Sequence, residues 1–488
     1  MNRDAGGTNG PGAAGGNGAT PARPSSMETP PSGRLGTFSS LGIANFRYLW
    51  LGQLSHAGAL WMEQIARPFL ILEITDGSAT HVGGVIAMRT LPQLLFGVWA
   101  GVIADWFDRR MVLLLDKVAV LLLNVLFAVL IVSGTLELWH IYAYAFLRGS
   151  MMAFDQPARQ ALIPSIVTQD RVTNAIALMS ATQNTMRIVG AALGGFAYAV
   201  LGAEGAFVSI AVIYVGAVVF TYLLDVPTHE RPEGSGPGAM TRGLLDGVRY
   251  ALSHTAIRGI LLLSLVYFTF GMSYMQVFAP LFAEKVLDIG SFGFGFMTSL
   301  TGVGALVAAL VIAQRQPSRL GMILPLLAGV FGLMLIAFAA ATYLPRPAGL
   351  IVPLVLIMVV GGVQTGYFSL ARAMMLHSAP EAMRGRVVSL LSLDRAVMTA
   401  GAAAAGLLSD AMGVQPAQIV YGLICAAGGF AMLLLAPGFR ATRTVYVHHE
   451  EDDAPGEASE SASDGAVAQP SMAGREAVGS PQPSGRGR

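Results

Sequence analysis

The chain has 488 residues, of which 54% are hydrophobic and only 12% are charged, and its formal net charge is +1. Soluble domains carry about 25% charged residues, so this composition excludes a water-soluble globular protein and indicates a polytopic membrane protein. The near-zero net charge gives no sign of a nucleic-acid partner, and the single Cys425 excludes an intrachain disulfide framework.

Both ends of the chain are polar and of low complexity. Residues 1–40 are rich in Gly, Pro, Ser and Thr and lack the apolar stretch of a signal peptide. Residues 441–488 are similar and begin with an acidic cluster around His448 and His449. That cluster suits either a metal site or a solvated tail. We favour the tail, expect no metal and no cofactor, and predict that both ends are disordered.

Twelve apolar segments lie between the two ends, and each is long enough to cross a hydrocarbon layer of about 30 Å as a helix. Lipid offers no partners to the backbone, so these segments are expected to be helical. The predicted fold class is therefore an all-α membrane protein with 12 transmembrane helices in two six-helix bundles. The segments span residues 46–72, 80–105, 110–133, 138–162, 174–200, 203–225, 259–283, 290–314, 319–342, 348–372, 387–412 and 415–437.

The basic residues predict the orientation of the chain. With the N-terminus inside, the outer connections carry only Lys285 and Arg346, and this asymmetry is a strong positive-inside signal that places both termini in the cytoplasm. The cytoplasmic connections carry Arg109, Arg110, Arg159, Arg171, Arg231, Arg242, Arg249, Arg258, Arg315, Arg319, Arg372, Arg384 and Arg386.

The longest connection divides the chain into two halves. It runs over 226–258, and its second part has apolar residues at helical spacing with Arg on the other face, which predicts an amphipathic surface helix. The halves resemble copies, because Ala158-Arg159 recurs as Ala371-Arg372 at a corresponding helix end. The predicted domains are a tail (1–40), a bundle (41–225), the linker (226–258), a second bundle (259–440) and a tail (441–488).

One short loop carries a specific resemblance. The run from Gly101 to Arg110 resembles the signature between helices 2 and 3 of the major facilitator superfamily, with Gly101, Asp105, Asp108, Arg109 and Arg110 at the signature positions. Residues 153–164 and the run Arg384-Gly385-Arg386 resemble the helix 4 end and the helix 10–11 loop of the branch of enterobactin-exporter-like permeases and transmembrane secretion effectors.

The resemblance implies a cytoplasmic gate. In the family, the aspartate at position 105 meets the N-terminus of helix 11 and is braced by Arg109 when the gate is shut. The physics suits this role, because a helix N-terminus carries a partial positive charge and unpaired N–H groups. The alternative is a charge that only sets topology. Ala191 stands where the family's antiporter motif has proline, which weakens the inference of antiport.

Charges deep in the membrane are costly and point to functional sites. Glu63 and Arg67 are spaced i, i+4, so Glu63 suits either a proton carrier or a structural ion pair. Glu63, Asp394 and Asp155 are the candidates for coupling. The candidates for the cavity wall are Arg89, Arg148, Arg187, Arg395, Tyr267, Met275, Gln276, Gln364 and Tyr367.

Several arginines in one cavity favour an anionic or polar-aromatic cargo, unless each is paired with a carboxylate. Aromatic and Met residues suit bulky ligands, although helix packing or lipid contact explains most such residues. Walker and hydrolase motifs do not occur in the sequence, so we expect neither ATP drive nor an enzyme.

The function that the resemblance implies is secondary-active transport in a bacterial inner membrane by alternating access. We expect proton-coupled efflux of a drug, siderophore or secondary metabolite by a monomer in the lipid bilayer. An importer or facilitator is the alternative within transport. A membrane receptor or scaffold that does not transport is the alternative outside it.

Overall fold

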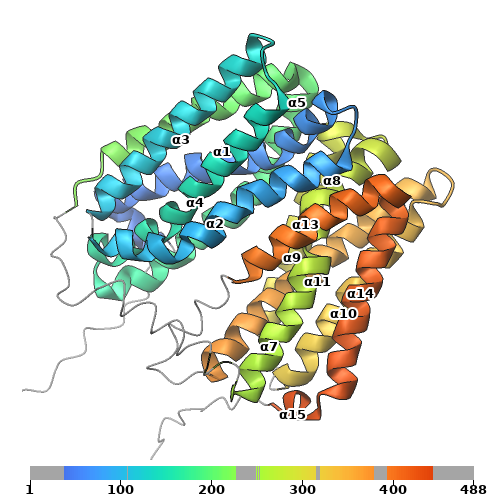
Figure 1. The fold of residues 1–488 in the computed structure, drawn as a ribbon. Coiled ribbons are helices and arrows are strands. Elements are labelled where there is room, and N and C mark those ends of the chain that lie inside the picture. Colours follow the sequence, from blue (N-terminus) through green and yellow to red (C-terminus); the bar gives the residue numbers. More distant parts are fainter. Residues whose placement is uncertain are drawn as a thin grey trace, which may run out of the picture. The chain divides into compact units, whose positions relative to one another are not determined.

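Figure 1 shows the computed structural model, which describes residues 38–106, 108–226, 249, 251, 253–314, 319–378 and 393–442. The side chains of 97–106, 313, 376, 377 and 393–396 lie outside this description. All described residues belong to one unit of the chain, which ends at Thr444. Most of both tails, including the His448 cluster, and most of the predicted surface helix lie outside the described residues.

The helices of the first half follow the apolar segments closely. Gly202 interrupts the longest one with φ of 69°, a value that Gly adopts without strain. This break falls between the predicted segments 174–200 and 203–225. The elements are η1 (Ser39–Gly42), α1 (Ala44–Ile74), α2 (Ala79–Trp106), α3 (Arg109–Val132), α4 (Leu138–Ile166), η2 (Gln169–Arg171) and α5 (Val172–Tyr222).

The second half is also built from helices joined by short turns within the described ranges. Its first predicted segment is a continuous helical stretch over 255–286 that contains three π-helical turns. The elements are α7 (Thr255–Val266), η3 (Tyr267–Gly271), η4 (Tyr274–Phe278), α8 (Ala279–Leu281), η5 (Phe282–Val286), α9 (Gly290–Gln314), α10 (Leu320–Ala341), α11 (Ala348–Ser378), α13 (Leu393–Met412), α14 (Val414–Leu435) and α15 (Pro437–Arg440).

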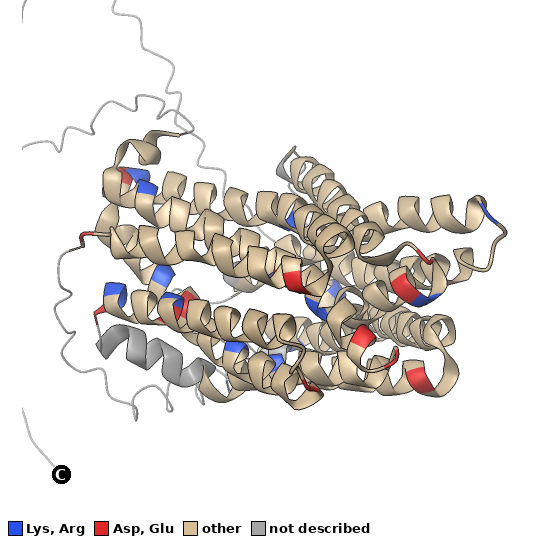
Figure 2. Cartoon of the chain, turned by 90° about the horizontal axis from the view of Figure 1, so that it is seen from above, with Lys and Arg blue, Asp and Glu red and all other residues tan. Residues whose placement is uncertain are grey.

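The outer surface of these helices suits a lipid environment. On α3, Leu115, Leu122, Leu126 and Val129 recur at helical spacing and are all exposed, as expected for a face that meets acyl chains. Figure 2 shows that charged residues are sparse along the helices. Seven helices within the described ranges are long and apolar enough to cross a membrane. The total of twelve crossings stays a prediction.

Small residues let helices of the two halves approach closely along two seams. In the first seam α2 meets α13, and a Cβ at Gly83 would collide with the carbonyl of Ala402. In the second seam α5 meets α9, and a Cβ at Gly195 would lie 2.5 Å from the carbonyl oxygen of Ser291. Gly83 is one turn into α2 and Ser291 begins α9. Both seams therefore lie toward the ends that the charge pattern predicts to be outer.

Candidate functional site

The cavity between the two halves consists of two neighbouring compartments. The central compartment has a volume of about 280 Å³, and the inner compartment, toward the predicted cytoplasmic ends, about 570 Å³. Leu60 and Met152 line both compartments, so the two lie next to each other. The central wall consists of Leu60, Trp61, Gln64, Arg89, Met152, Arg187, Met272, Met275, Gln276, Thr301, Gln364, Thr365 and Phe368.

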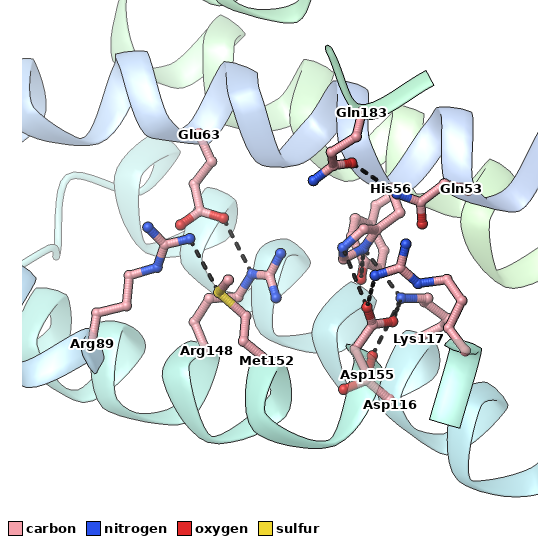
Figure 3. A network of polar contacts seen from close by, with 12 residues as sticks. Gln53, His56, Glu63, Arg89, Asp116, Lys117, Arg148, Met152, Asp155 and Gln183 are labelled. Atoms are coloured by element: carbon pink, nitrogen blue, oxygen red, sulfur yellow. Dashed lines mark hydrogen bonds and ion pairs between the residues drawn. The ribbon is translucent and has the colours of Figure 1, made fainter. Parts of the chain in front are cut away.

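One buried ion cluster, the Glu63 cluster, joins α1 to α4. It contains Glu63, Arg67 and Arg148, each about 1% exposed. The Arg67 Nη1 atom lies 2.6 Å from Glu63 Oε1, as the i, i+4 spacing allows. Arg148 Nε lies 3.2 Å from Glu63 Oε2 (Figure 3). The single carboxylate of Glu63 therefore forms ion pairs with two guanidinium groups. The sequence indicates the first contact and gives no indication of the second.

Arg89 lies beside this cluster on α2 and has neutral partners. Its guanidinium donates to Gln64 Oε1 at 2.8 Å and contacts the sulfur of Met152 at 3.2 Å. Gln64 in turn donates to Gln276 Oε1 at 2.6 Å, across the interface between the two halves. This chain of contacts links the wall of the central compartment from α4 through α2 and α1 to η4.

Arg187 is the second arginine of the central compartment. It lies on α5 and is half-buried. Within the described ranges it makes no ion pair, and its buried Nε atom has no hydrogen-bond partner. Its neighbour Gly190 lies against Trp61 and Gly58, which holds α5 close to α1. Arg187 therefore reaches the cavity from a tightly packed pair of helices.

A second buried ion cluster, the Asp155 cluster, lies two turns of α1 closer to the predicted cytoplasmic ends. It contains His56, Asp116, Lys117, Asp155 and Arg159 (Figure 3). Lys117 forms ion pairs with Asp155 and with Asp116, the latter at 3.4 Å, and Arg159 Nη2 lies 3.0 Å from Asp155 Oδ2. Two carboxylates and two cations make the cluster neutral when His56 is uncharged. His56, Asp155 and Arg159 also line the inner compartment.

The hydrogen bonds fix the ring of His56. Its Nδ1 atom lies 3.2 Å from Lys117 Nζ and 2.9 Å from the hydroxyl of Tyr214. An ammonium group only donates, so Nδ1 is the acceptor and the proton of a neutral ring sits on Nε2. That nitrogen lies 3.9 Å from Asp155 Oδ2. The cluster therefore places a titratable ring between an ammonium group and a carboxylate.

Sequence reasoning missed Lys117 and His56 as site residues. The signal for Lys117 is its residue type, because Lys117 and Lys285 are the only lysines in a chain that otherwise uses arginine. Lys117 also lies within an apolar helix, where a charge points to function. His56 had a weaker signal, since one His in an apolar helix is often only a packed side chain.

The predicted cytoplasmic loop between α2 and α3 is partly described. The Asp108 carboxylate caps α3 by accepting from Met111 N at 2.9 Å. Arg109 donates to the carbonyl of Ala161 at 3.1 Å, and Arg110 to the carbonyl of Tyr222 at 2.9 Å. These contacts tie the start of α3 to the ends of α4 and α5.

The predicted partners across the cytoplasmic gate are not described. Gly101 and Asp105 lie on α2, and Asp394 and Arg395 on α13, with side chains outside the described residues. The run 384–386 lies wholly outside them. The gate hypothesis and the coupling role of Asp394 therefore stay predictions.

The candidates from the second half separate into two groups. Met275, Gln276 and Gln364 line the central compartment. Tyr267 and Tyr367 are buried inside the second half, where their rings stack with centroids 3.9 Å apart. Phe368, the residue after Tyr367, supplies the aromatic wall of the compartment instead. The sequence predicts aromatic residues at this place. The rotation of α11 about its own axis decides which of the two neighbouring rings reaches the cavity.

The π-helical turns explain how the first helix of the second half reaches the cavity. The amide of Met272 bonds to the carbonyl of Tyr267 at 3.0 Å, an i→i+5 contact. Such turns are frequent at functional sites, because the extra residue changes the direction of the side chains that follow. Met272, Met275 and Gln276 follow this turn and line the compartment.

A polar contact closes the first seam at its outer end. Asp410, in the last turn of α13, accepts three hydrogen bonds from the N-terminus of α2. The donors are the Ser78 hydroxyl at 3.0 Å, the Ala79 amide at 3.0 Å and the Thr80 amide at 2.7 Å. A carboxylate at a helix N-terminus is favourable, since it meets unpaired N–H groups and the positive end of the helix dipole.

Comparisons with known proteins agree with this arrangement. The profile of a family described as transmembrane secretion effector matches residues 35–454. The chain is 26% identical to the staphyloferrin A transporter of Staphylococcus aureus over 74% of this chain and 89% of that protein. It is 28% identical to the multidrug efflux pump Tap of Mycolicibacterium fortuitum, over 72% and 86%.

A solved structure shares the fold. A mutant of the nucleoside transporter NupG matches with a TM-score of 0.64 and 12% sequence identity, over 80% of this chain and 99% of that chain. At this identity the likeness concerns the fold alone.

Proposed function

The chain belongs to the transmembrane secretion effector family of major facilitator transporters, and we propose that it exports small organic molecules in exchange for protons. Its relatives are transporters, so it is a multi-pass membrane transporter of small molecules and not an enzyme. Export, proton drive and placement in a bacterial inner membrane with both termini in the cytoplasm are our proposals. We take 41–225 and 259–440 as the two moving bundles, joined by the linker 226–258.

The observation that carries the proposal is a cavity between the halves with a buried ion cluster in its wall. A cavity walled by both halves suits alternating access, in which the bundles move around a central site. The outer seams are closed by glycine packing and by Asp410. The inner compartment lies toward the cytoplasmic ends, which supports loading of cargo from that side.

We propose Asp155 as the carboxylate that couples proton movement to transport. Asp155 lines the inner compartment and lies against Lys117, Arg159 and the imidazole of His56. Protonation of Asp155 weakens its ion pairs, and this gives the two states of the carrier different internal contacts. A conformational change needs such a difference in interaction free energy.

Glu63 is less suited to carrying protons. It lines neither compartment, and two guanidinium groups hold its carboxylate in the charged form. We therefore assign Glu63 a structural role, which was the alternative to a proton carrier in the sequence. Asp105 and Arg109 keep their proposed role in the cytoplasmic gate, together with the 384–386 loop.

One comparison favours export over import. The chain resembles a multidrug efflux pump over most of its length. The name of the staphyloferrin A transporter gives no direction, so that relative does not distinguish export from import. The wall of the central compartment combines Met, Trp and Phe side chains with glutamines, and soft apolar walls of this kind accept cargo of varied shape.

The test is transport by the full chain in proteoliposomes. Two xanthene dyes, anionic carboxyfluorescein and cationic tetramethylrosamine, serve as probes in vesicles with an acidic lumen. We expect at least one dye to accumulate inside through the transporters whose cytoplasmic face is outward, and a protonophore to abolish accumulation. Accumulation only with an alkaline lumen indicates import with protons. Movement of neither dye under either gradient contradicts the proposed function.

A further inference from the structure

The two compartments contain more positive than negative charge. Among their described lining residues are Arg89 and Arg187 in the central compartment and Arg159 and Arg372 in the inner one. The one carboxylate in these walls is Asp155, which already pairs with Lys117 and Arg159. Arg89, Arg187 and Arg372 make no ion pair within the described ranges, so the described walls have a surplus of guanidinium groups.

The nearest other carboxylate does not remove this surplus. Glu63 has both oxygens occupied by Arg67 and Arg148, which leaves three arginines of this region against one carboxylate when Arg89 is included. Arg89 is only 7% exposed, and its two terminal nitrogens contact an amide oxygen and a thioether. A buried guanidinium group with neutral partners only is costly at membrane depth.

The geometry favours a ligand that supplies the missing negative charge. Guanidinium groups bind carboxylate, sulfonate and phosphate groups through two parallel hydrogen bonds, which gives both affinity and orientation. Arg187 is half-buried and lines the central compartment, so its guanidinium group is accessible from the cavity, while its buried Nε atom has no hydrogen-bond partner in the described chain. The remaining wall is apolar, with Trp61, Met275 and Phe368 facing the same space.

We propose that the central compartment binds an amphipathic organic anion, with Arg89 and Arg187 as the anion-binding pair and the Met and aromatic wall against its apolar body. This inference rests on the proposed function, because it names the class of cargo that the exporter carries. The 280 Å³ of the central compartment admits a small molecule, and the 570 Å³ of the inner compartment accommodates a longer body. Arg372, which lines the inner compartment, makes the approach from the predicted cytoplasmic side attractive to anions.

The first test is equilibrium binding without any gradient. Full-length protein in an uncharged detergent is titrated into carboxyfluorescein and, separately, into tetramethylrosamine, and fluorescence anisotropy reports binding. The dyes share a xanthene core and differ in the sign of their charge. We expect carboxyfluorescein to bind more tightly than tetramethylrosamine, and added salt to weaken its binding.

Two substitutions assign the effect to the arginine pair. We expect Arg187→Gln to weaken carboxyfluorescein binding about tenfold or more, because a charge-assisted hydrogen bond is lost, and to leave tetramethylrosamine binding unchanged or stronger. Arg187→Lys keeps the charge and should recover part of the affinity. Arg89→Gln should have a similar effect, but Arg187 is the safer site because it is less buried.

The matched control is Arg346→Gln, which removes a cation from a predicted outer loop and should leave binding of both dyes unchanged. An unchanged thermal unfolding midpoint for Arg187→Gln shows that its loss of binding is local. Absence of carboxyfluorescein binding, or equal binding by Arg187→Gln and the unmodified protein, overturns the inference.

The two assays separate this inference from the proposed function. Gradient-driven accumulation of tetramethylrosamine without carboxyfluorescein binding supports export and contradicts the anion site. Arginine-dependent carboxyfluorescein binding without movement of either dye supports the anion site and contradicts export.

Discussion

The interiors of the two halves differ in the kind of polar group that they bury. The buried charged residues of the described chain all lie in the first half: Glu63, Arg67, Arg89, Asp116, Lys117, Arg148 and Asp155. The buried polar side chains of the second half are neutral: Ser264, Ser273, Ser291, Thr298, Thr301, Ser409 and Gln418. The second half packs aromatic rings against one another, as in the stacked Tyr267–Tyr367 pair and the edge-to-face Phe282–Phe338 pair.

This difference indicates a division of labour around one cavity. Ion clusters change strength with protonation, so the first half is suited to sensing protons and to holding a charged group of the cargo. Aromatic and Met side chains can contact apolar groups of many shapes, because such contacts do not require a fixed geometry. The second half is therefore suited to the variable body of the cargo. If this is right, equivalent substitutions should affect the two halves very differently.

The largest effect is expected for Asp155→Asn in the first half. The amide cannot release or take up a proton, so we expect accumulation against the gradient to fall to background while downhill exchange continues. Dye flux in proteoliposomes at equal protein content measures both. Asp225→Asn, at an exposed position after α5, is the control and should transport normally. Uphill transport by Asp155→Asn would contradict the proposal that this residue couples proton movement to transport.

A large loss of stability is expected for Arg148→Met. This change leaves Arg67 as the sole partner of the buried Glu63, and removal of one member of a buried ion pair costs about 3–5 kcal/mol. Unfolding in detergent, followed by far-UV circular dichroism, gives the loss. Arg258→Met removes an exposed arginine of α7 and should change little. A similar small effect from both variants would show that the Glu63 cluster does not stabilise the first half.

A moderate effect is expected where the halves meet. Asp410→Asn weakens the contact with the N-terminus of α2, which should increase the population with an open outer seam about fivefold or more. The buried seam residue Ala405, changed to Cys, reports opening through its reaction with a membrane-impermeant maleimide. The single native Cys425 is buried, so the label reports the new site.

The control for this experiment is Asp288→Asn in the same Ala405→Cys background. Asp288 lies in another outer turn and has positive φ, which Asn tolerates. Equal labelling rates for Asp410→Asn and the control would show that Asp410 does not hold the seam closed.

The smallest effect is expected for Tyr267→Phe in the second half. The Tyr267 hydroxyl is buried and has no hydrogen-bond partner within the described ranges, so its removal should change stability by less than about 1 kcal/mol, in the stabilising direction. Tyr367→Phe is the matched comparison, because that hydroxyl contacts Ser264 Oγ at 3.3 Å. Destabilisation by Tyr267→Phe that exceeds the effect of Tyr367→Phe would indicate a polar function in the second half.

Local sequence information was sufficient to predict the helices. The bounds of α9, Gly290–Gln314, coincide with the predicted segment, because a long apolar run ends where polar residues begin. The break at Gly202 and the contact between Glu63 and Arg67 also follow from neighbours in the chain. The major facilitator family was likewise identified from one contiguous loop.

Contacts between helices that are far apart in the chain could not be predicted from local sequence. Arg148 is 85 residues from Glu63, and Gln64 is 212 residues from Gln276. Such pairs depend on which face each helix turns toward its neighbours, and a single sequence does not specify that rotation. The same limit explains why Tyr367 was expected in the cavity wall, where the structure has Phe368.

The π-helical turns of the stretch 255–286 have a consequence for how the cavity wall can adapt. Each contains one residue more than an α-turn needs, and its hydrogen bonds are easily exchanged for those of the α-helix. Moving the extra residue by one position along the stretch rotates the side chains that it passes by about 100° around the helix axis. Met272, Met275 and Gln276 can thus be replaced at the wall by their neighbours while both ends of the helix stay in place. The cavity then has a built-in means of changing its lining without a change in sequence.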